Sequence, residues 1–272
     1  MDEFNKPDEP IDEVEEEEEL GFTDKFISVL TEPGILFSKL SNLPVKTMDW
    51  FIPVLILIIT VIAMQFIIFT NPTLKSVVID KQMERIEKSL QEAVDKGQMT
   101  QAQADEQLER TAEFMEQGGS MQIVFGAIGT FIFVFIFFFI VAGVFLLVAK
   151  FALGGTGDYK ASMLAYGLPN YIGALNVIVM ILASILLGKV LENVSVGSFM
   201  GIESEGIFGW FMHKLDPLSI WFYTVVGIAY AKMFKSENTV KYIATILGIW
   251  IGFSLIMHFV TKVFPFLKQF GM

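Results

Sequence analysis

The feature that most constrains this chain is a long stretch without charge, which runs from Gln122 to Ala149. Between Phe131 and Phe139 every residue is Phe, Ile or Val. About 20 apolar residues in an α-helix suffice to cross roughly 30 Å of hydrocarbon. Because the stretch is continuous rather than alternating, a helix is favoured over a membrane β-strand. It therefore predicts a membrane-spanning helix.

Further apolar stretches predict an all-α fold, a polytopic membrane helix bundle with about five transmembrane helices. The composition agrees, since 53% of the residues are hydrophobic and soluble domains have about 45–50%. The stretch at 217–234 is near the lower length limit for a span. The last two spans are joined by only a few residues and are expected to be antiparallel neighbours. The expected spans are 50–70, 122–149, 161–187, 217–234 and 240–260.

The net charge of the chain belongs to its N-terminal tail. Residues 1–24 hold 12 of the 30 acidic residues and one lysine, a charge of −11 that equals that of the whole chain. This composition predicts a disordered acidic tail, which would repel nucleic acid. Residues 25–49 mix apolar and polar positions at helical spacing, which predicts amphipathic helices at the membrane surface. Residues 263–272 form a short C-terminal tail.

The polar segment 71–121, between the first two spans, predicts an extramembrane helical hairpin. Residues 95–98 (DKGQ) would stop its first helix, and Thr100 with Gln103 predicts a capping box at the start of its second. Apolar residues repeat along each helix as in a coiled coil. The hairpin is either a self-contained cap or a surface for a protein partner. Its two apolar seams are Ile79, Met83, Ile86, Leu90 and Ala93, and Leu108, Ala112 and Met115.

The distribution of basic residues predicts an orientation. Short loops next to membrane spans carry an excess of lysine on the cytoplasmic side. The density of lysines favours a cytoplasmic N-terminus and a C-terminus outside. The segment 188–216, which joins the third and fourth spans, is rich in apolar residues and is expected to lie on the membrane surface. The lysines that favour this orientation are Lys25, Lys39, Lys46, Lys150, Lys160, Lys232, Lys235 and Lys241.

The sequence offers no catalytic residues, metal ligands or cofactor motif. The predicted spans have no interior Asp, Glu, Lys or Arg, which argues against ion-coupled transport or a proton relay, although a passive pore stays open. The chain has no cysteine and two histidines, and no HExxH motif, so no metal site is expected. We therefore expect a protein that is not an enzyme and uses no cofactor.

The glycine loop of Gly154, Gly155 and Gly157 is the first of two motifs that invite a functional interpretation. A phosphate-binding loop would need a following lysine, which is missing at the required spacing. An intramembrane aspartyl protease would need a second membrane aspartate to share a proton with Asp158. The favoured interpretation is structural, since glycine permits a sharp turn between the second and third spans.

The second motif is a predicted kink in the third span at Gly167 and Pro169. A proline inside a helix frees a backbone carbonyl one turn earlier and bends the helix. Within a membrane that carbonyl needs another donor, and Asn170 and Asn176 are the candidates. The kink is either a packing device or the wall of a functional cavity.

Several short motifs, taken in order, give the chain a resemblance to a known family. Trp50 and Pro53 open the first span, GGTGDYKASM precedes AYGLPNYIGAL in the third, and DPLSIW opens the fourth. GIAYAKMFKSENTVKY and LGIWIGF follow. Over about residues 30–262, apart from the hairpin, the chain resembles the Yip (Ypt/Rab-interacting protein) domain family of five-span membrane proteins, and is most similar to its bacterial branch.

The resemblance implies a membrane-organising or scaffold role related to membrane traffic, without catalytic residues, in the bacterial inner (cytoplasmic) membrane. Family members engage prenylated Rab GTPases through the cytoplasmic tail. The alternative is a passive transporter or small channel component, which would need one continuous wet path lined by polar residues of the last three spans. Expected partners are the lipid bilayer, a protein bound by the hairpin or the acidic tail, and a second copy of the chain through small-residue faces such as Gly126 with Gly129 or Gly248 with Gly252.

Overall fold

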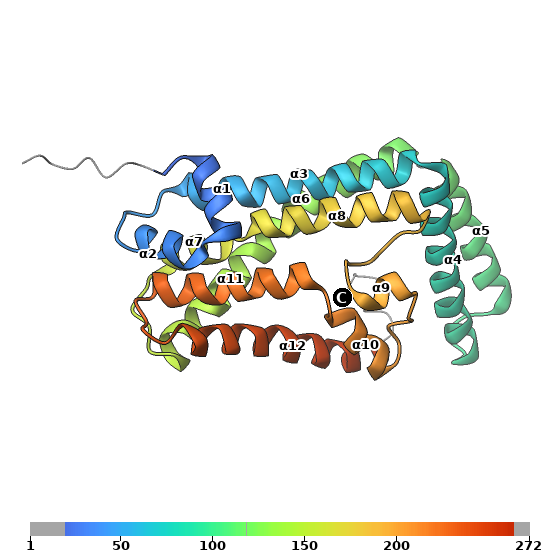
Figure 1. The fold of residues 1–272 in the computed structure, drawn as a ribbon. Coiled ribbons are helices and arrows are strands. Elements are labelled where there is room, and N and C mark those ends of the chain that lie inside the picture. The colour runs from blue at the N-terminus through green and yellow to red at the C-terminus, as the bar shows by residue number, and fades with distance from the viewer. Residues whose placement is uncertain (1–19, 118, 264–272) are drawn as a thin grey trace, which may run out of the picture.

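The computed structural model describes residues 20–117 and 119–263, and within these ranges every regular element is a helix. This confirms the all-α prediction for the described chain. Most of the predicted acidic tail, and nearly all of the C-terminal tail, lie outside the described residues. The bundle contains α3 (Thr47–Thr70), α6 (Gly119–Leu147), α8 (Asn170–Leu187), α11 (Pro217–Met233) and α12 (Thr239–Val263). In Figure 1 α3, α8 and α11 run in nearly the same direction, and α6 crosses them diagonally.

Four helical segments are long and apolar enough to cross a membrane, and they indicate a membrane protein. Large apolar side chains cover their outer faces, among them Phe125 and Phe133, which are 67% and 63% exposed. A continuous apolar surface of this kind is stable against lipid and unstable against water. The four segments are Thr47–Thr70, Ile123–Ala152, Tyr159–Leu187 and Thr239–Val263.

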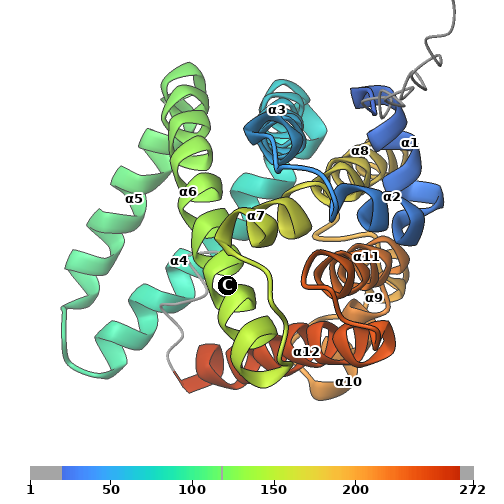
Figure 2. The same ribbon diagram turned by 90° about the vertical axis from the view of Figure 1, so that its left-hand side faces the viewer.

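Helix α11, which corresponds to the predicted fourth span, differs from these four. It has 17 residues, a length of about 25 Å, and length and composition alone do not establish it as a span. It is also the most enclosed of the long helices. Viewed along the bundle in Figure 2, it lies between α2 and α8 on one side and α12 on the other. Its buried residues are Val225, Val226, Gly227, Ala229, Tyr230, Ala231 and Met233.

Two short helices, α1 (Phe22–Thr31) and α2 (Pro33–Leu40), attach at one end of the bundle (Figure 1). Pro33 occupies the first turn of α2, where its missing N–H breaks no helical hydrogen bond. α2 packs against α11 and buries Leu36 and Phe37. The outward faces of both helices stay apolar, with Ile27 51% and Ile35 56% exposed.

A buried ion pair fastens α1 to the bundle. Nζ of Lys25 lies 2.6 Å from a carboxylate oxygen of Asp49, and the two side chains are only 10% and 7% exposed. The sequence-based boundary placed Asp49 just outside the first span. α3 starts three residues earlier, at Thr47, so Asp49 lies in its first turn, before the predicted span of residues 50–70. The carboxylate fits there because it is paired and lies in the first helical turn.

The link between α6 and α7 (Tyr159–Gly167) turns around the end of α11. α6 continues into a π-helical turn, η1 (Val148–Ala152), and then into the glycine loop. Gly154 adopts φ = +74°, which favours glycine. A Cβ on Gly155 or Gly157 would come within 2.7 or 2.8 Å of Phe234 side-chain atoms. The three glycines therefore let the loop turn and close over Phe234.

The hairpin consists of α4 (Pro72–Asp95) and α5 (Gln101–Gln117), which pack side by side across one end of the bundle (Figure 1). Gly97 ends α4 with φ = +68°, and the Gln98 amide donates to the Ala93 carbonyl. The capping box is present, since Thr100 and Gln103 exchange two hydrogen bonds of 2.9 and 3.3 Å. All the predicted seam residues are half-buried.

The segment between α8 and α11 contains two short helices that the sequence did not predict, α9 (Val196–Met200) and α10 (Ile207–Lys214). Trp210 of α10 donates its indole N–H to the hydroxyl of Ser254, far along α12, at 3.2 Å. Phe199, Met200, Phe208 and Phe211 leave between 47% and 70% of their surface exposed. Both ends of the bundle therefore carry short helices with uncovered apolar faces.

Candidate binding cavity

A cavity of about 410 Å³ lies between α3, α6, α8 and α11. Its volume falls within the range of about 300–1,000 Å³ that is usual for small-molecule sites. Part of its lining is apolar, here called the apolar wall, and part carries amides, hydroxyls and two carboxylates, here called the polar wall. The apolar wall includes Val54, Leu57, Phe133, Val134, Phe137, Val177 and Met180, and the polar wall includes Asn170, Asn176, Glu192, Asn193, Asp216 and Ser219.

The predicted kink forms part of this wall. The third apolar segment is broken into α7 and α8 at Pro169. The Asn170 amide donates to the carbonyls of Tyr166 at 2.8 Å and Gly167 at 3.0 Å. The predicted donor Asn170, at the start of α8, thus satisfies two carbonyls of the last turn of α7. Gly167 also permits contact with α3, since a Cβ there would lie 2.5 Å from that of Trp50.

The start of α11 supplies the buried carboxylate. Asp216 is 1% exposed and accepts backbone N–H bonds from Leu218 and Ser219, as an N-cap before a first-turn proline. Its second oxygen accepts from the Ser219 hydroxyl at 2.8 Å and from the Asn176 amide at 3.3 Å. Asn176 therefore ties α8 to α11 across the cavity, and the Asp216 carboxylate has four donors.

The second carboxylate, Glu192, connects the cavity to the hairpin. One oxygen of Glu192 lies 3.7 Å from the guanidinium of Arg85 and 3.9 Å from Nζ of Lys81, both on α4. The Glu192 side chain is half exposed. Ion pairs this long and this exposed contribute little stability, so this carboxylate stays accessible to another cation.

A third charged group, Lys214 at the end of α10, lies near the same end of α11. Its Nζ stands 5.7 Å from the centre of the Trp250 ring. Burial lowers the pKa of Lys214, and the neighbouring Asp216 carboxylate opposes this shift. Lys214 does not line the cavity, so the carboxylates are the charges that a ligand would meet first.

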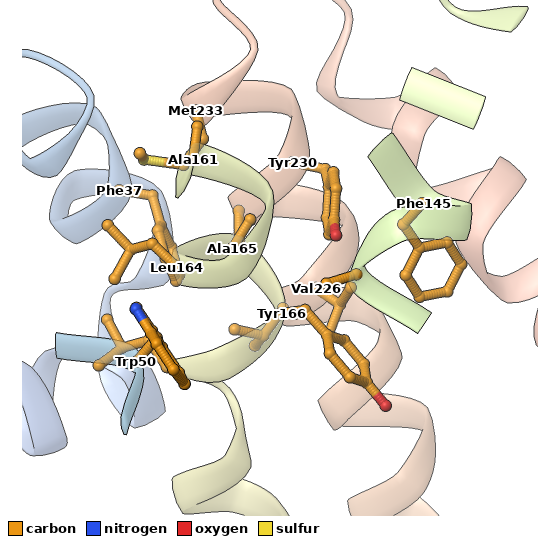
Figure 3. Close-up of a cluster of buried hydrophobic side chains, with 14 of the residues drawn as sticks. Phe37, Trp50, Phe145, Ala161, Leu164, Ala165, Tyr166, Val226, Tyr230 and Met233 are labelled. Carbon is orange, nitrogen blue, oxygen red and sulfur yellow. The ribbon is translucent and has the colours of Figure 1, made fainter. Parts of the chain in front are cut away.

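At its other end the cavity meets a tightly packed aromatic cluster. Tyr166 stacks on Phe138 with ring centres 5.7 Å apart, and Phe145 packs edge-on against Tyr230. The hydroxyl of Tyr230 is hydrogen-bonded to that of Ser162 at 2.6 Å, fully buried. Figure 3 shows Phe145, Tyr166 and Tyr230 with Trp50 and the small residues Ala161 and Ala165 of α7 between the helices. The polar lining does not extend past this cluster among the described residues.

The structure thus brings together some of the residues that the sequence singled out and separates others. Asn170 and Asn176 line the cavity, with Gly167 and Pro169 at its kinked wall. The glycine loop lies at the opposite end of the bundle and is not part of it (Figure 1). Sequence reasoning missed Asp216 and Glu192 as cavity residues, although the Asp-Pro pair at 216–217 is a recognisable helix-start signal.

Replacing Asn170 tests whether its amide supports the kink. Asn170→Asp replaces the donating NH₂ by an acceptor and leaves two buried carbonyls without their partner, at a cost of about 1–3 kcal/mol. We expect a clearly lower melting temperature for the purified protein in detergent. Asn238→Asp, in the exposed linker before α12, is the matched control and should melt like the wild type. Equal melting of the two variants would mean that the Asn170 amide is dispensable.

The fold and the cavity define an all-helical membrane protein with an amphipathic internal site. Comparison of the chain with family models, curated proteins and solved structures found no match in any of the three. The function therefore has to be inferred from the geometry. Within the described residues, no group of three or more His, Asp or Glu side chains is placed to hold a metal ion.

Proposed function

We propose that this chain is a non-enzymatic, five-span integral membrane protein of the Yip-like type, with a membrane-organising or scaffold role. The fifth span in this proposal is α11. Trp210, just before α11, contacts Ser254 on α12, whereas the linker after α11 leads directly into α12 at Thr239. The two contact points on α12 are about 22 Å apart along its axis. α11 itself is about 25 Å long, which is at the lower limit for a helix that crosses the hydrocarbon core.

The proposed orientation places the N-terminus in the cytoplasm and the C-terminus outside, in a bacterial inner membrane. α1, α2, the glycine loop and the linker before α12 gather at one end of the bundle (Figure 1). Lysines that favoured this orientation lie in these elements or next to them, including Lys39, Lys160 and Lys235. If that end of the bundle faces the cytoplasm, the hairpin at the other end lies on the outer side of the membrane. It is then the candidate surface for a protein partner.

The observation that carries the proposed role is the apolar face of α1 and α2. Both helices sit at the end of the bundle, and Phe22, Phe26, Ile27 and Ile35 are each between 40% and 56% exposed. Amphipathic helices in this position insert their apolar side chains about 5–10 Å into one leaflet. An insertion confined to one leaflet expands that leaflet and bends the membrane. The ion pair of Lys25 would transmit this force to the bundle.

The alternative role, a passive channel, finds less support. A channel needs a wet path from end to end, but the cavity is closed at one end by the aromatic cluster around Tyr166 and Tyr230. Opening it would require several fully buried rings to move. We therefore favour the scaffold over the channel.

Reconstitution into lipid vesicles tests the proposed role. We expect wild-type protein to shift vesicles towards smaller diameters in cryo-electron micrographs, and the double variant Phe22→Ser with Ile27→Ser to lose most of this effect. Phe114→Ser is the control, because Phe114 is 67% exposed on the hairpin, away from α1. Vesicle diameters that do not change with wild-type protein would refute the proposal, as would flux of a small solute through the reconstituted protein.

A second copy of the chain is also a proposed partner. A Cβ added at Gly129, Gly248 or Gly252 would meet nothing within 4 Å. These glycines therefore lie on open faces, where small residues permit close approach of another helix.

A further inference from the structure

The polar wall of the cavity offers a ligand mainly hydrogen-bond acceptors. Asn170 donates its NH₂ group to two backbone carbonyls, and Asn176 donates its own to Asp216 and Ser219. A side-chain amide has one NH₂ group and one carbonyl oxygen. The atoms that these two residues have left for a ligand are therefore their oxygens.

The charges on this wall are both negative. Asp216 is held at the start of α11 by four donors and is almost fully buried. Glu192 has its nearest cations at 3.7 and 3.9 Å, beyond the usual hydrogen-bond length. The Glu192 carboxylate can therefore accept a hydrogen bond from a cationic group placed in the cavity. A head group with a net negative charge would be repelled there.

The apolar part of the lining reaches the outer surface of the bundle. Phe133 and Phe137 line the cavity and are also 63% and 47% exposed. Leu57 and Met180 continue the apolar surface inward. Since α6 is one of the helices apolar enough to cross a membrane, this side of the cavity is within reach of lipid. The cavity is thus suited to a molecule with an apolar chain and a cationic, donating head.

We propose that the cavity binds an aminophospholipid, with its primary ammonium on the polar wall and an acyl chain against Phe133 and Phe137. A primary ammonium supplies three N–H donors, and the Glu192 carboxylate is its charged acceptor, while the Asn176 oxygen is a further acceptor of the same lining. A choline head has the same charge but no N–H, and a glycerol head leaves the lipid anionic. This binding site goes beyond the proposed scaffold role and does not depend on it.

Lipid retention tests the proposal. The protein is reconstituted in nanodiscs with equal amounts of phosphatidylethanolamine, phosphatidylcholine and phosphatidylglycerol, released into mild detergent, and the lipids that stay bound are counted by native mass spectrometry. We expect phosphatidylethanolamine to exceed each of the other two about tenfold, the effect of one charge-assisted hydrogen bond. Equal retention of the three lipids would overturn the proposal.

Two variants locate the binding to the cavity. Glu192→Gln and Asn176→Leu are each expected to reduce the preference for phosphatidylethanolamine at least severalfold. The control is Lys81→Gln with Arg85→Gln, which breaks the Glu192 ion pairs but keeps its carboxylate, and it should retain the preference. Melting temperatures show which variants are folded. A preference unchanged in both folded cavity variants would place the lipid elsewhere and overturn the assignment.

A final comparison separates a lipid from a small amine. Excess free ethanolamine, added to the wild-type complex, should leave the bound lipid in place, because it lacks the chain that contacts Phe133 and Phe137. Displacement of the lipid by ethanolamine alone would show that the cavity recognises only the amine, and the lipid assignment would be wrong.

Discussion

Replacing either member of the Lys25–Asp49 pair is expected to destabilise the protein by about 3–5 kcal/mol, among the largest effects of any single substitution in the described chain. Lys25→Met leaves the Asp49 carboxylate buried and unpaired, and Asp49→Asn leaves the lysine in the same condition. In either variant α1 loses its main polar attachment to α3. We expect a melting temperature lowered by many degrees and faster proteolysis between α1 and α2.

The double variant Lys25→Met with Asp49→Asn distinguishes the interaction between the two charges from the other contacts of each side chain. With both charges removed, much of the lost stability should return, because neither buried charge is left without its partner at this site. The exposed pair of Glu84 and Lys88 on α4, 2.9 Å apart, is the matched control, and Lys88→Met should leave the melting temperature unchanged. Additive losses in the double variant would show that the two charges do not interact.

The second large effect is expected where glycines permit helices to touch. A Cβ at Gly167 would lie 2.5 Å from the Cβ of Trp50, and one at Gly227 would lie 2.6 Å from the Cα of Ile243. Because the obstacles are at or next to the backbone, the helices have to move apart, which costs about 1–3 kcal/mol or more. We expect Gly167→Ala and Gly227→Ala to give little folded protein after purification in mild detergent.

The same substitution at Gly129 and Gly248, which meet nothing within 4 Å, provides the control for these two variants. Gly129→Ala and Gly248→Ala should be purified in wild-type yield, and alanine should even favour the helix slightly. If all four variants behaved alike, the contacts of α7 with α3 and of α11 with α12 would not depend on the missing side chains.

The sequence predicts the helices well, because a helix that faces lipid has a long uncharged apolar stretch that can be recognised from the sequence alone. It predicts the hairpin too, since Thr100, Gln103 and Gly97 mark helix ends through local hydrogen bonds. The weaker prediction concerns α11. α11 is largely enclosed by other helices and contacts little lipid, so it can be shorter than a lipid-facing span. The usual count of about 20 apolar residues therefore does not establish it as a span.

The cavity could be predicted only in part. Asn170 was recognisable because Pro169 stands beside it, and the need for a donor follows from local chemistry. Asp216 pairs with Asn176 across 40 residues, and Glu192 meets Arg85 across more than a hundred. Such partners are set by how the helices pack, and nothing in the local sequence of either residue specifies them.

The position of α11 has a consequence for the order of biosynthesis. This helix is the last but one to leave the ribosome, yet it fills the space that α2, α7 and α8 enclose. Those earlier helices must therefore enter the bilayer while their common groove is still vacant, and lipid tails have to occupy it in the interim. Arrival of α11 then expels these tails, so the last fifth of translation completes the interior of the protein.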